Sequence, residues 1–210
     1  MNCILLSPPG AGKGTQAKNI VENFNMLHFS AGDMLRKAKE YDKTIDVILS
    51  SGQLVPDDVI VNIINEKLER ENVNNGFILD GFPRNITQAN RLNFILEKKN
   101  IKIDKVFFID IDFNEAINRI TGRRICRCGA SYNIVKLPPK ENGKCDYCYS
   151  DLIQRNDDKE DILIDRFIVY KNQTEPLIDY YKKKNLLVVI DGLENEKKVF
   201  MQISSYISCC

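Results

Sequence analysis

The residues Ser7-Pro8-Pro9-Gly10-Ala11-Gly12-Lys13-Gly14-Thr15 join a short apolar run, Cys3–Leu6, to a segment with the apolar spacing of a helix. Small residues let consecutive backbone N–H groups turn toward one anion, and the start of a helix adds the positive end of its dipole. Lys13 supplies a mobile ammonium, and the Thr15 hydroxyl is a suitable ligand for Mg²⁺. The stretch therefore predicts a phosphate-binding loop between a buried strand and a helix.

A flexible strand-to-helix turn is the simpler interpretation of the same residues. The general phosphate-loop motif has glycine where this chain has Ser7, and Gly14 separates Lys13 from the hydroxyl residue. We nevertheless favour the phosphate loop, because lysine and threonine both stand at its end and a helical pattern follows at once.

Apolar runs alternate with segments of helical spacing along the chain. Buried strands are predicted for the apolar runs, and helices for the segments between them, beginning with Ala17, Ile20, Val21 and Phe24 on one face. The runs are Cys3–Leu6, Gly76–Leu79, Val106–Ile111 and Leu186–Ile190. This alternation predicts an α/β fold, with a parallel sheet covered by helices on both faces.

Two long segments interrupt the alternation. Residues 30–55 are helical in pattern and polar, whereas residues 122–158 hold clustered cysteines, Pro138-Pro139 and little apolar periodicity. Long segments outside the core of a compact domain are usually lids or binding loops. We therefore expect two lobes, 30–55 and 122–158, inserted into a core of residues 1–29, 56–121 and 159–210.

The composition and the distribution of apolar residues exclude some classes of protein. The chain has 210 residues, with 30 Lys plus Arg against 29 Asp plus Glu and a formal net charge of +1, so no broad nucleic-acid or membrane footprint is expected. No stretch reaches the roughly 20 apolar residues of a membrane span, and the first residues lack the pattern of a secretory signal. We therefore expect a reducing, cytoplasmic location.

Two motifs together resemble the nucleoside monophosphate kinases, above all the adenylate kinases. They are Gly-Ala-Gly-Lys-Gly-Thr-Gln after Pro9, and Asp80-Gly81-Phe82-Pro83-Arg84 after an apolar strand. The resemblance extends along nearly the whole chain. It implies a P-loop NTPase-like core with a five-stranded parallel sheet, an NMP-binding lobe and a LID lobe, and a monomer. It also implies reversible Mg²⁺-dependent transfer of a phosphoryl group, ATP plus AMP giving two ADP.

The same resemblance implies roles for individual residues. The transferring phosphoryl group would be neutralised by Lys13, Arg84, Arg123, Arg155 and Arg166. ATP would contact Gly10, Ala11, Gly12, Lys13, Gly14, Thr15, Arg119, Arg123, Ser131, Tyr132 and Leu193. AMP would contact Ala31, Arg36, Gln53, Leu54, Val55, Gly81, Arg84, Gln88, Arg155 and Arg166, and Thr15, Asp80 and Asp33 would hold Mg²⁺ through water.

Some of these residues have plainer interpretations. Arg36, Arg155 and Arg166 read in isolation as surface charges. Asp80 alone reads as a turn or capping residue. Arg119 and Arg123, four residues apart, are expected on one face of a helix over Asn114–Gly122 that Asn114 caps. His28 is expected to be a packing residue.

Two residues bear on the identity of the acceptor base, and they favour different bases. Gln88 matches the glutamine that reads adenine in adenylate kinases, whereas Ala31 matches the alanine of uridylate–cytidylate kinases. We weigh Gln88 more heavily, since a bidentate amide discriminates between bases by roughly 1–3 kcal/mol. A UMP/CMP-type kinase stays the alternative, and the donor, ATP or GTP, stays open.

Four of the seven cysteines gather in the second inserted segment as Cys126-Arg127-Cys128 and Cys145-Asp146-Tyr147-Cys148. Such pairs favour one structural Zn²⁺, with reduced thiols and a disulfide as alternatives. The family's zinc-bearing lid usually has Cys-x-x-Cys first, so the shorter Cys-x-Cys is expected to strain the ligand geometry. The cysteines also motivate a remote alternative, a P-loop ATPase with a zinc-ribbon nucleic-acid-binding module. Cys209-Cys210 lacks a prenylation pattern and is expected to be an unmodified tail.

Overall fold

The phosphate-loop segment lies between a buried strand and a helix, as the sequence predicts. The computed structural model describes residues 1–38 and 42–208, so Cys209-Cys210 and residues 39–41 of the first lobe lie outside it. Strand β1 (Asn2–Leu6) ends just before the loop, and helix α1 (Lys13–Phe24) begins inside it. All of β1 except its first residue is buried, because helices cover the sheet on both faces.

The central sheet has five strands in the order β2-β3-β1-β4-β7, and every pairing in it is parallel. Strands β3 (Phe77–Asp80), β4 (Lys105–Asp110) and β7 (Leu187–Asp191) coincide with predicted apolar runs to within one residue. The predicted α/β fold with a parallel sheet is thereby confirmed. Parallel strands share one carboxyl edge, which is where ligands bind in open α/β sheets.

The fifth strand, β2 (Leu27–Ser30), was not located by apolar periodicity. It is only four residues long and contains His28 and Ser30, so its pattern is too polar and too short to indicate a buried strand. Pairing with β3 sets Ser30 opposite Asp80, at the carboxyl edge.

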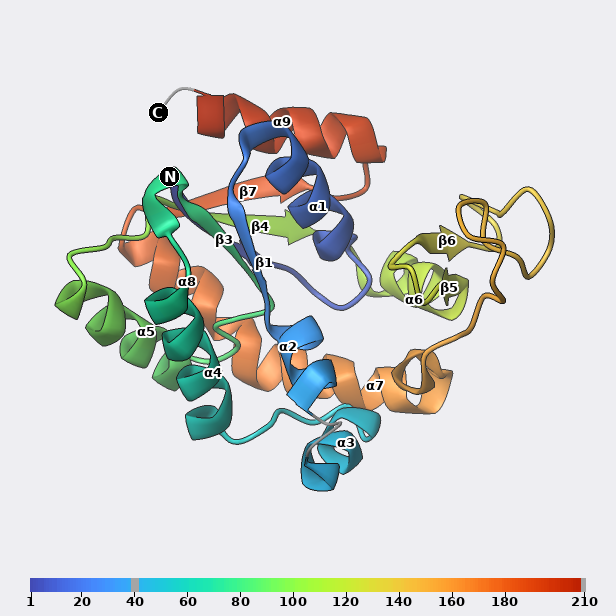
Figure 1. Cartoon of the computed structure of the whole chain (residues 1–210), viewed down its shortest axis with the longest axis horizontal. Coiled ribbons are helices and arrows are strands. Elements are labelled where there is room, and N and C mark those ends of the chain that lie inside the picture. The colour runs from blue at the N-terminus through green and yellow to red at the C-terminus, as the bar shows by residue number, and fades with distance from the viewer. Residues whose placement is uncertain (39–41, 209–210) are drawn as a thin grey trace.

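Alternate residues of β1 enter two separate cores. Cys3 and Leu5 pack with residues of α1 and α9 (Glu196–Ser208), which cover one face of the sheet. Ile4 and Leu6 pack with α4 (Asp57–Arg70), α5 (Ile86–Lys98) and α8 (Pro176–Lys183) on the other face (Figure 1). The period-2 alternation of a strand thus places both helical layers against one central element.

Two groups of elements extend away from the sheet (Figure 1). The first is α2 (Ala31–Ala38) with α3 (Lys43–Ser50), and the second is a small antiparallel sheet of β5 (Arg123–Ile125) and β6 (Ser131–Asn133). They fall within the predicted lobes 30–55 and 122–158.

The remaining elements connect these parts. They are η1 (Val73–Asn75), α6 (Phe113–Thr121), η2 (Asn156–Asp158), α7 (Glu160–Val169) and the π-helical turn η3 (Tyr170–Thr174). Among the described residues, no helix is both long and apolar enough to cross a lipid bilayer.

Candidate functional site

The phosphate loop presents an open backbone at the start of α1. Gly12 is the N-cap of α1 and has a left-handed backbone with φ +82°, a conformation that glycine adopts without strain. A Cβ atom at Gly12 would meet no other atom within 4 Å, so the space in front of this backbone is free. The start of a helix, with its N–H groups and the positive end of its dipole, is a common place for an anion to bind.

Lys13 and Asp80 bring the two motifs into contact. Lys13 Nζ lies 3.0 Å from Asp80 Oδ1, at the carboxyl end of β3. Burial raises the pKa of Asp80, but the ammonium of Lys13 and the imidazole of His28 outweigh it and hold this pKa well below its usual range. Asp80 is therefore an ionised carboxylate beside the phosphate loop.

His28 corrects one of our expectations. Its Nε2 lies 3.3 Å from Asp80 Oδ2, so the side chain is a hydrogen-bonding partner of the site rather than a packing residue. The register of β2 beside β3, in which His28 pairs with Ile78, brings the ring within reach of Asp80.

Arginines from two segments converge on the aspartates Asp157 and Asp158 of η2, of which Asp158 is buried. Arg123 Nε donates to Asp158 Oδ2 at 2.8 Å, and its Nη2 donates to Oδ1 of the same carboxylate. Arg166 Nη1 donates to the carbonyl of Asp157 at 2.7 Å and lies 3.2 Å from the Asp157 carboxylate. Asp158 is fully buried, so these arginines are held in place rather than solvated.

The same cluster is crowded with positive charge. Burial lowers the pKa of Arg84 to about 10, with the Arg166 guanidinium as the next cause. Burial together with Arg123 and Arg36 also lowers the pKa of Arg155 to about 10. Among the atoms that the structure describes, Arg155 Nε is buried without a hydrogen-bond partner. A buried donor without a partner, among cations that repel one another, indicates a site completed by an anionic ligand.

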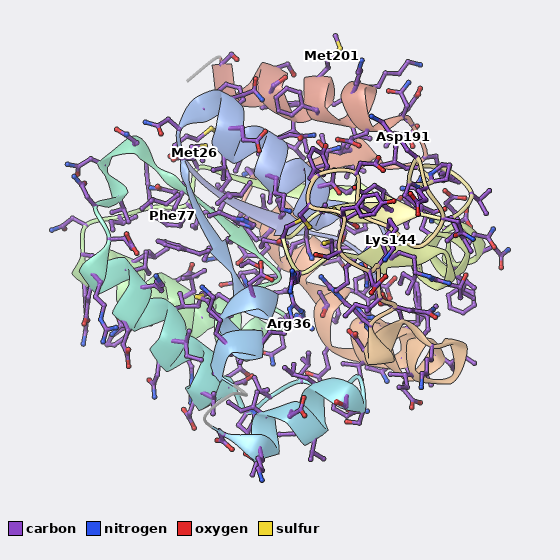
Figure 2. The ribbon with its side chains drawn as sticks, turned by 45° about the vertical axis from the view of Figure 1, so that its right-hand side comes forward. Met26, Arg36, Phe77, Lys144, Asp191 and Met201 are labelled. Atoms are coloured by element: carbon purple, nitrogen blue, oxygen red, sulfur yellow. The ribbon has the colours of Figure 1, made fainter. Side chains whose placement is uncertain are left out.

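The first lobe contributes an arginine and a pocket wall. Figure 2 labels Arg36 on α2, near the middle of the molecule, where its Nη2 donates to Asp33 at 2.6 Å. Gln53, Leu54 and Val55 line a pocket of about 490 Å³, whose opposite wall includes Asp165 and Ile168 of α7. The structure thus places Gln53, Leu54 and Val55 in the lining of one concave space, whereas Arg36 does not line it.

Gly81 and Arg84 follow β3 and face α2. Gly81 has φ +76°, and a Cβ there would lie 3.4 Å from the Arg84 guanidinium and 3.9 Å from Ala31 Cβ. Arg84 Nε donates to the Gly81 carbonyl at 3.0 Å. A Cβ would make only ordinary contacts there, so it is the left-handed backbone that favours glycine at this position.

Gln88 has an amide whose orientation is set by its neighbours. Its Oε1 accepts from the Arg84 N–H at 2.7 Å, and its Nε2 donates to Asp57 Oδ1 at 2.7 Å. A backbone N–H cannot accept and a carboxylate cannot donate, so the oxygen and nitrogen ends cannot exchange. The side chain is 2% exposed, with one amide hydrogen and one lone pair left for a ligand.

The residues predicted to flank a donor nucleoside lie in different surroundings. Arg119 is on α6 and bonds to Glu115, Ser131 is exposed in β6, and Leu193 is exposed after β7. Tyr132 instead is buried in the second lobe, where its hydroxyl accepts from the Asp146 N–H at 2.8 Å. The hydroxyl of Tyr132 is therefore used within the lobe.

The expectation of one helical face for Arg119 and Arg123 was wrong. Helix α6 is capped by Asp112, whose side chain accepts from the Glu115 N–H, and it ends at Thr121. Arg123 lies in β5, and Asn114 is an interior residue of the helix. The helix begins earlier than expected because β4 ends at Asp110, which leaves Asp112 in the capping position.

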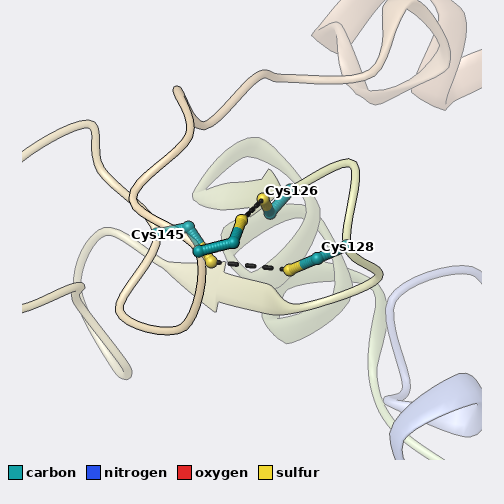
Figure 3. A group of neighbouring side chains, drawn as sticks. Cys126, Cys128 and Cys145 are labelled. Atoms are coloured by element: carbon teal, nitrogen blue, oxygen red, sulfur yellow. Dashed lines mark hydrogen bonds between the residues drawn. The ribbon is translucent and has the colours of Figure 1, made fainter.

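The four cysteines meet at one point in the second lobe. Their sulfur atoms all lie within 4.8 Å of one another, with 3.3 Å between Cys126 and Cys148 and 3.6 Å between Cys128 and Cys145 (Figure 3). A tetrahedral Zn²⁺ with Zn–S bonds of about 2.3 Å holds its sulfur ligands about 3.8 Å apart. The shortened Cys126-Arg127-Cys128 pair thus reaches the spacing that a four-thiolate site requires.

Proteins of known function are similar to this chain along nearly its whole length. The family model described as adenylate kinase matches residues 5–186. The adenylate kinase of Methanothrix thermoacetophila is 47% identical over 212 residues, which cover 99% of this chain and 99% of that protein. The adenylate kinase of Archaeoglobus fulgidus is 46% identical and covers 99% of this chain and 98% of its own length. The chain belongs to the adenylate kinase family.

Membership makes this chain a phosphotransferase of the nucleoside monophosphate kinase class and confirms the resemblance seen in the motifs. The adenylate kinase of Finegoldia magna is 47% identical over 197 residues, which cover 91% of this chain and 92% of that protein. The match therefore includes both inserted segments as well as the core.

Sequence reasoning for this adenylate kinase family member missed two acidic residues of the site. Asp157 and Asp158 appeared only as part of an acidic stretch between Arg155 and Arg166. Their signal was available, since two adjacent carboxylates between two arginines can pair with both. The burial of Asp158, however, depends on Arg123, which lies 35 residues away in the chain.

Proposed function

We propose that the chain catalyses the reversible transfer of the γ-phosphoryl group of ATP to AMP, giving two ADP. One observation carries this proposal beyond family membership. Burial, and after it the neighbouring guanidinium groups of the arginine cluster, lower the pKa of Arg84 and of Arg155 to about 10, and Arg155 Nε has no hydrogen-bond partner among the described residues. Two nucleotides bound phosphate to phosphate would supply the anions that this cluster lacks.

The reaction needs positioning and charge stabilisation more than acid–base chemistry. A phosphate oxygen of AMP attacks the γ-phosphorus, a new P–O bond forms, and the bond to the β–γ bridging oxygen breaks, leaving ADP. The attacking oxygen is already mostly anionic at neutral pH, because the second pKa of a phosphate monoester is about 6. Lys13, Arg84, Arg123, Arg155 and Arg166 would stabilise the charge that spreads over the transferring group.

The donor set at the end of β3 fits Mg²⁺. Asp80 is ionised, and its Oδ2 lies 3.8 Å from the position of a Cβ at Gly14, next to Thr15. Carboxylate and hydroxyl oxygens are ligands that Mg²⁺ prefers, usually with several retained waters. Thr15, Asp80 and Asp33 would hold the ion through water, and when bound it would neutralise charge on the β- and γ-phosphates.

Both inserted segments would close over the nucleotides. Ala31, Arg36 and the Gln53–Val55 stretch would hold AMP, whereas Arg119, Ser131, Tyr132 and Leu193 would flank the donor nucleoside. Closure of residues 122–158 as a LID lobe and 30–55 as an NMP-binding lobe would exclude water, which otherwise competes for the γ-phosphoryl group. A monomer in the cytoplasm fits this function.

The four cysteines would hold one structural Zn²⁺. Hydrogen bonds from Tyr132 and from backbone N–H groups outweigh burial and lower the pKa of Cys145 to about 6, which favours the thiolate that binds metal. Four thiolates leave no open position for a reacting water, so the ion would stabilise the LID lobe without joining the chemistry.

The reaction is tested with purified protein and Mg²⁺. ADP should appear from ATP plus AMP, and ADP alone should yield ATP plus AMP in equal amounts. The reverse reaction separates this proposal from the ATPase alternative, because a hydrolase cannot make ATP from ADP. Release of inorganic phosphate without consumption of AMP would contradict the proposal.

Acceptor selectivity follows from the fixed amide of Gln88. Its free lone pair on Oε1 and free hydrogen on Nε2 match an amino group next to an unprotonated ring nitrogen, as in adenine. Inosine and uracil present a carbonyl next to an N–H, the opposite order. We expect kcat/KM for AMP to exceed that for IMP by roughly 10- to 100-fold, on the scale of bidentate amide readout.

A UMP/CMP-type kinase is the second candidate, motivated by Ala31, which is 1% exposed at the start of α2. Cytosine has the same amino-and-nitrogen order as adenine, so CMP is the critical competitor. Turnover with AMP, CMP, UMP and IMP at one Mg²⁺ concentration separates the candidates. AMP should lead, and a higher kcat/KM for CMP would reverse the assignment.

A further inference from the structure

The helix that follows the second lobe contains an irregular turn next to the arginine cluster. Helix α7 continues into the π-helical turn η3 and then into α8, and the Glu175 N–H donates to the Tyr170 carbonyl at 2.9 Å, five residues back. A π-helical turn holds one more residue than an α-helical turn, so it rotates the side chains that follow it. Such turns are frequent at functional sites.

Thr174 ends this turn and points away from its own helix. Its Oγ1 donates to the main-chain carbonyl of Arg84 at 2.8 Å, across 90 residues of sequence, and the side chain is 9% exposed. A threonine inside a regular helix usually bonds the carbonyl four residues earlier in its own helix. Here the hydroxyl is used instead on the segment that carries Arg84.

Arg84 is held by hydrogen bonds from three directions. Its N–H donates to Gln88 Oε1, its guanidinium Nε donates to the Gly81 carbonyl, and its own carbonyl accepts from Thr174. Gly81 precedes Arg84 by three residues and Gln88 follows it by four, so both of these bonds are local in the sequence. Of these three bonds, the one from Thr174 joins Arg84 to a segment that is distant in the sequence.

We propose that Thr174 is a positioning residue for Arg84, with the π-helical turn delivering its hydroxyl to the Arg84 carbonyl. This inference rests on the proposed function, in which Arg84 contacts the transferring phosphoryl group. Helix α7 also carries Arg166, eight residues before Thr174. One continuous helical segment therefore holds one arginine of the site directly and fixes the backbone of another.

This arrangement addresses a physical problem of the site. Arg84 and Arg166 repel one another, and the guanidinium of Arg166 helps to lower the pKa of Arg84. Two like charges drift apart unless their backbones are tied. A misplacement of about 1 Å in a catalytic group can cost about 100-fold in rate, so a single tie between the two segments has a measurable effect.

The test is a pair of substitutions at Thr174. Thr174→Val keeps the β-branched shape and removes the hydroxyl, and we expect it to lower kcat by about 10-fold, the equivalent of one hydrogen bond. Thr174→Ser keeps the hydroxyl and should restore kcat to within about twofold of the wild type. KM for ATP should stay within about twofold in both, because Thr174 acts on the placement of Arg84 and not on donor binding.

A double-mutant cycle with Arg84→Ala distinguishes positioning from general stability. If Thr174 acts through Arg84, Thr174→Val should cause no further loss of kcat in the Arg84→Ala background, whereas independent effects multiply. The matched control is Thr121→Val, which removes a hydroxyl that donates to the Ile117 carbonyl within its own helix and should leave kcat unchanged.

Each outcome decides the proposal. It stands if Thr174→Val loses kcat, Thr174→Ser recovers it, and the cycle is non-additive. Unchanged kcat in Thr174→Val, or losses that multiply with Arg84→Ala, would overturn it. If Thr174→Val does not fold, Thr174→Ala carries the same comparison with Thr174→Ser. If the wild-type protein makes no ADP from ATP and AMP, that result contradicts the proposed function itself.

Discussion

Replacing Arg84 with alanine should lower kcat by about a thousandfold or more, while the protein stays as stable as the wild type. An arginine that stabilises the charge of a transferring phosphoryl group contributes about 10³ to 10⁵ in rate. The charged side chain of the same residue lowers the stability of the folded protein, because burial and the neighbouring Arg166 disfavour its charge and lower its pKa to about 10. Removing a desolvated cation relieves that cost, as expected where function and stability compete.

The measurement pairs steady-state ADP formation with thermal unfolding. Arg91→Ala is the matched control, because Arg91 lies on α5, is 43% exposed in its side chain and pairs with Asp58 on the surface. It should retain kcat within about twofold, since exposed ion pairs contribute about 0–1 kcal/mol. Retention of more than a tenth of wild-type kcat by Arg84→Ala would remove Arg84 from the reaction.

Chemistry carried by consecutive residues was predictable from sequence. The phosphate loop needs only small residues, a lysine and a helix start in order, and β1 and α1 flank it as expected. The Asp80–Arg84 motif was expected to lie beside the phosphate loop. Both follow strands of a parallel sheet, and the carboxyl ends of such strands meet at one edge. Local pattern and sheet geometry were sufficient for this half of the site.

Contacts between distant segments were not predictable in the same way. The pairing of Arg123 with Asp158, the contact of His28 with Asp80 and the tie from Thr174 to Arg84 join residues 35, 52 and 90 positions apart. None of these pairs leaves a local periodicity, and a π-helical turn changes which side chains point inward. The side-chain partners of a buried polar group are set by tertiary packing.

The four cysteines come together although their first pair is short, and the strain expected for that pair stays a prediction. A Cys-x-Cys pair was expected to strain the ligand geometry, yet the four sulfur atoms come within 4.8 Å of one another. Gly129, with φ +89°, donates its N–H to the Cys126 carbonyl at 2.9 Å and closes a tight turn around the pair. Glycine adopts this left-handed backbone without strain, which suits the residue that follows the second cysteine.

Removing the metal from this cluster should unfold the second lobe while the core stays folded. The buried apolar cluster of the lobe consists of Cys126, Tyr132 and Cys145, with Ala130 and Leu152 packed against it. So small a core cannot stabilise a lobe alone, which is why domains of this size depend on metals or disulfides. The binding free energy of a structural Zn²⁺, about 10–16 kcal/mol in small peptides, is then largely folding free energy of the lobe.

The expected result is local. In protein stripped of metal by a strong chelator at low pH and returned to neutral pH, backbone amides of β5 and β6 should exchange hydrogen at least about 100-fold faster. Amides of β1 and β4 should keep their protection. ADP formation should fall by about 100-fold or more, because Arg123 and Arg155 are then no longer held at the phosphates.

A substitution distinguishes the effect of losing the metal from any other effect of the chelator treatment. In native mass spectrometry we expect one zinc ion per wild-type chain, and Cys145→Ser should abolish that zinc content and reproduce the fast exchange of the lobe. Tyr147→Phe is the control, because Tyr147 lies in the same Cys145–Cys148 loop but is 85% exposed. It should retain metal and protection. Wild-type protein that contains no metal yet protects β5 and β6 as strongly as β1 would show that thiols and packing alone hold the lobe, and the zinc assignment would be wrong.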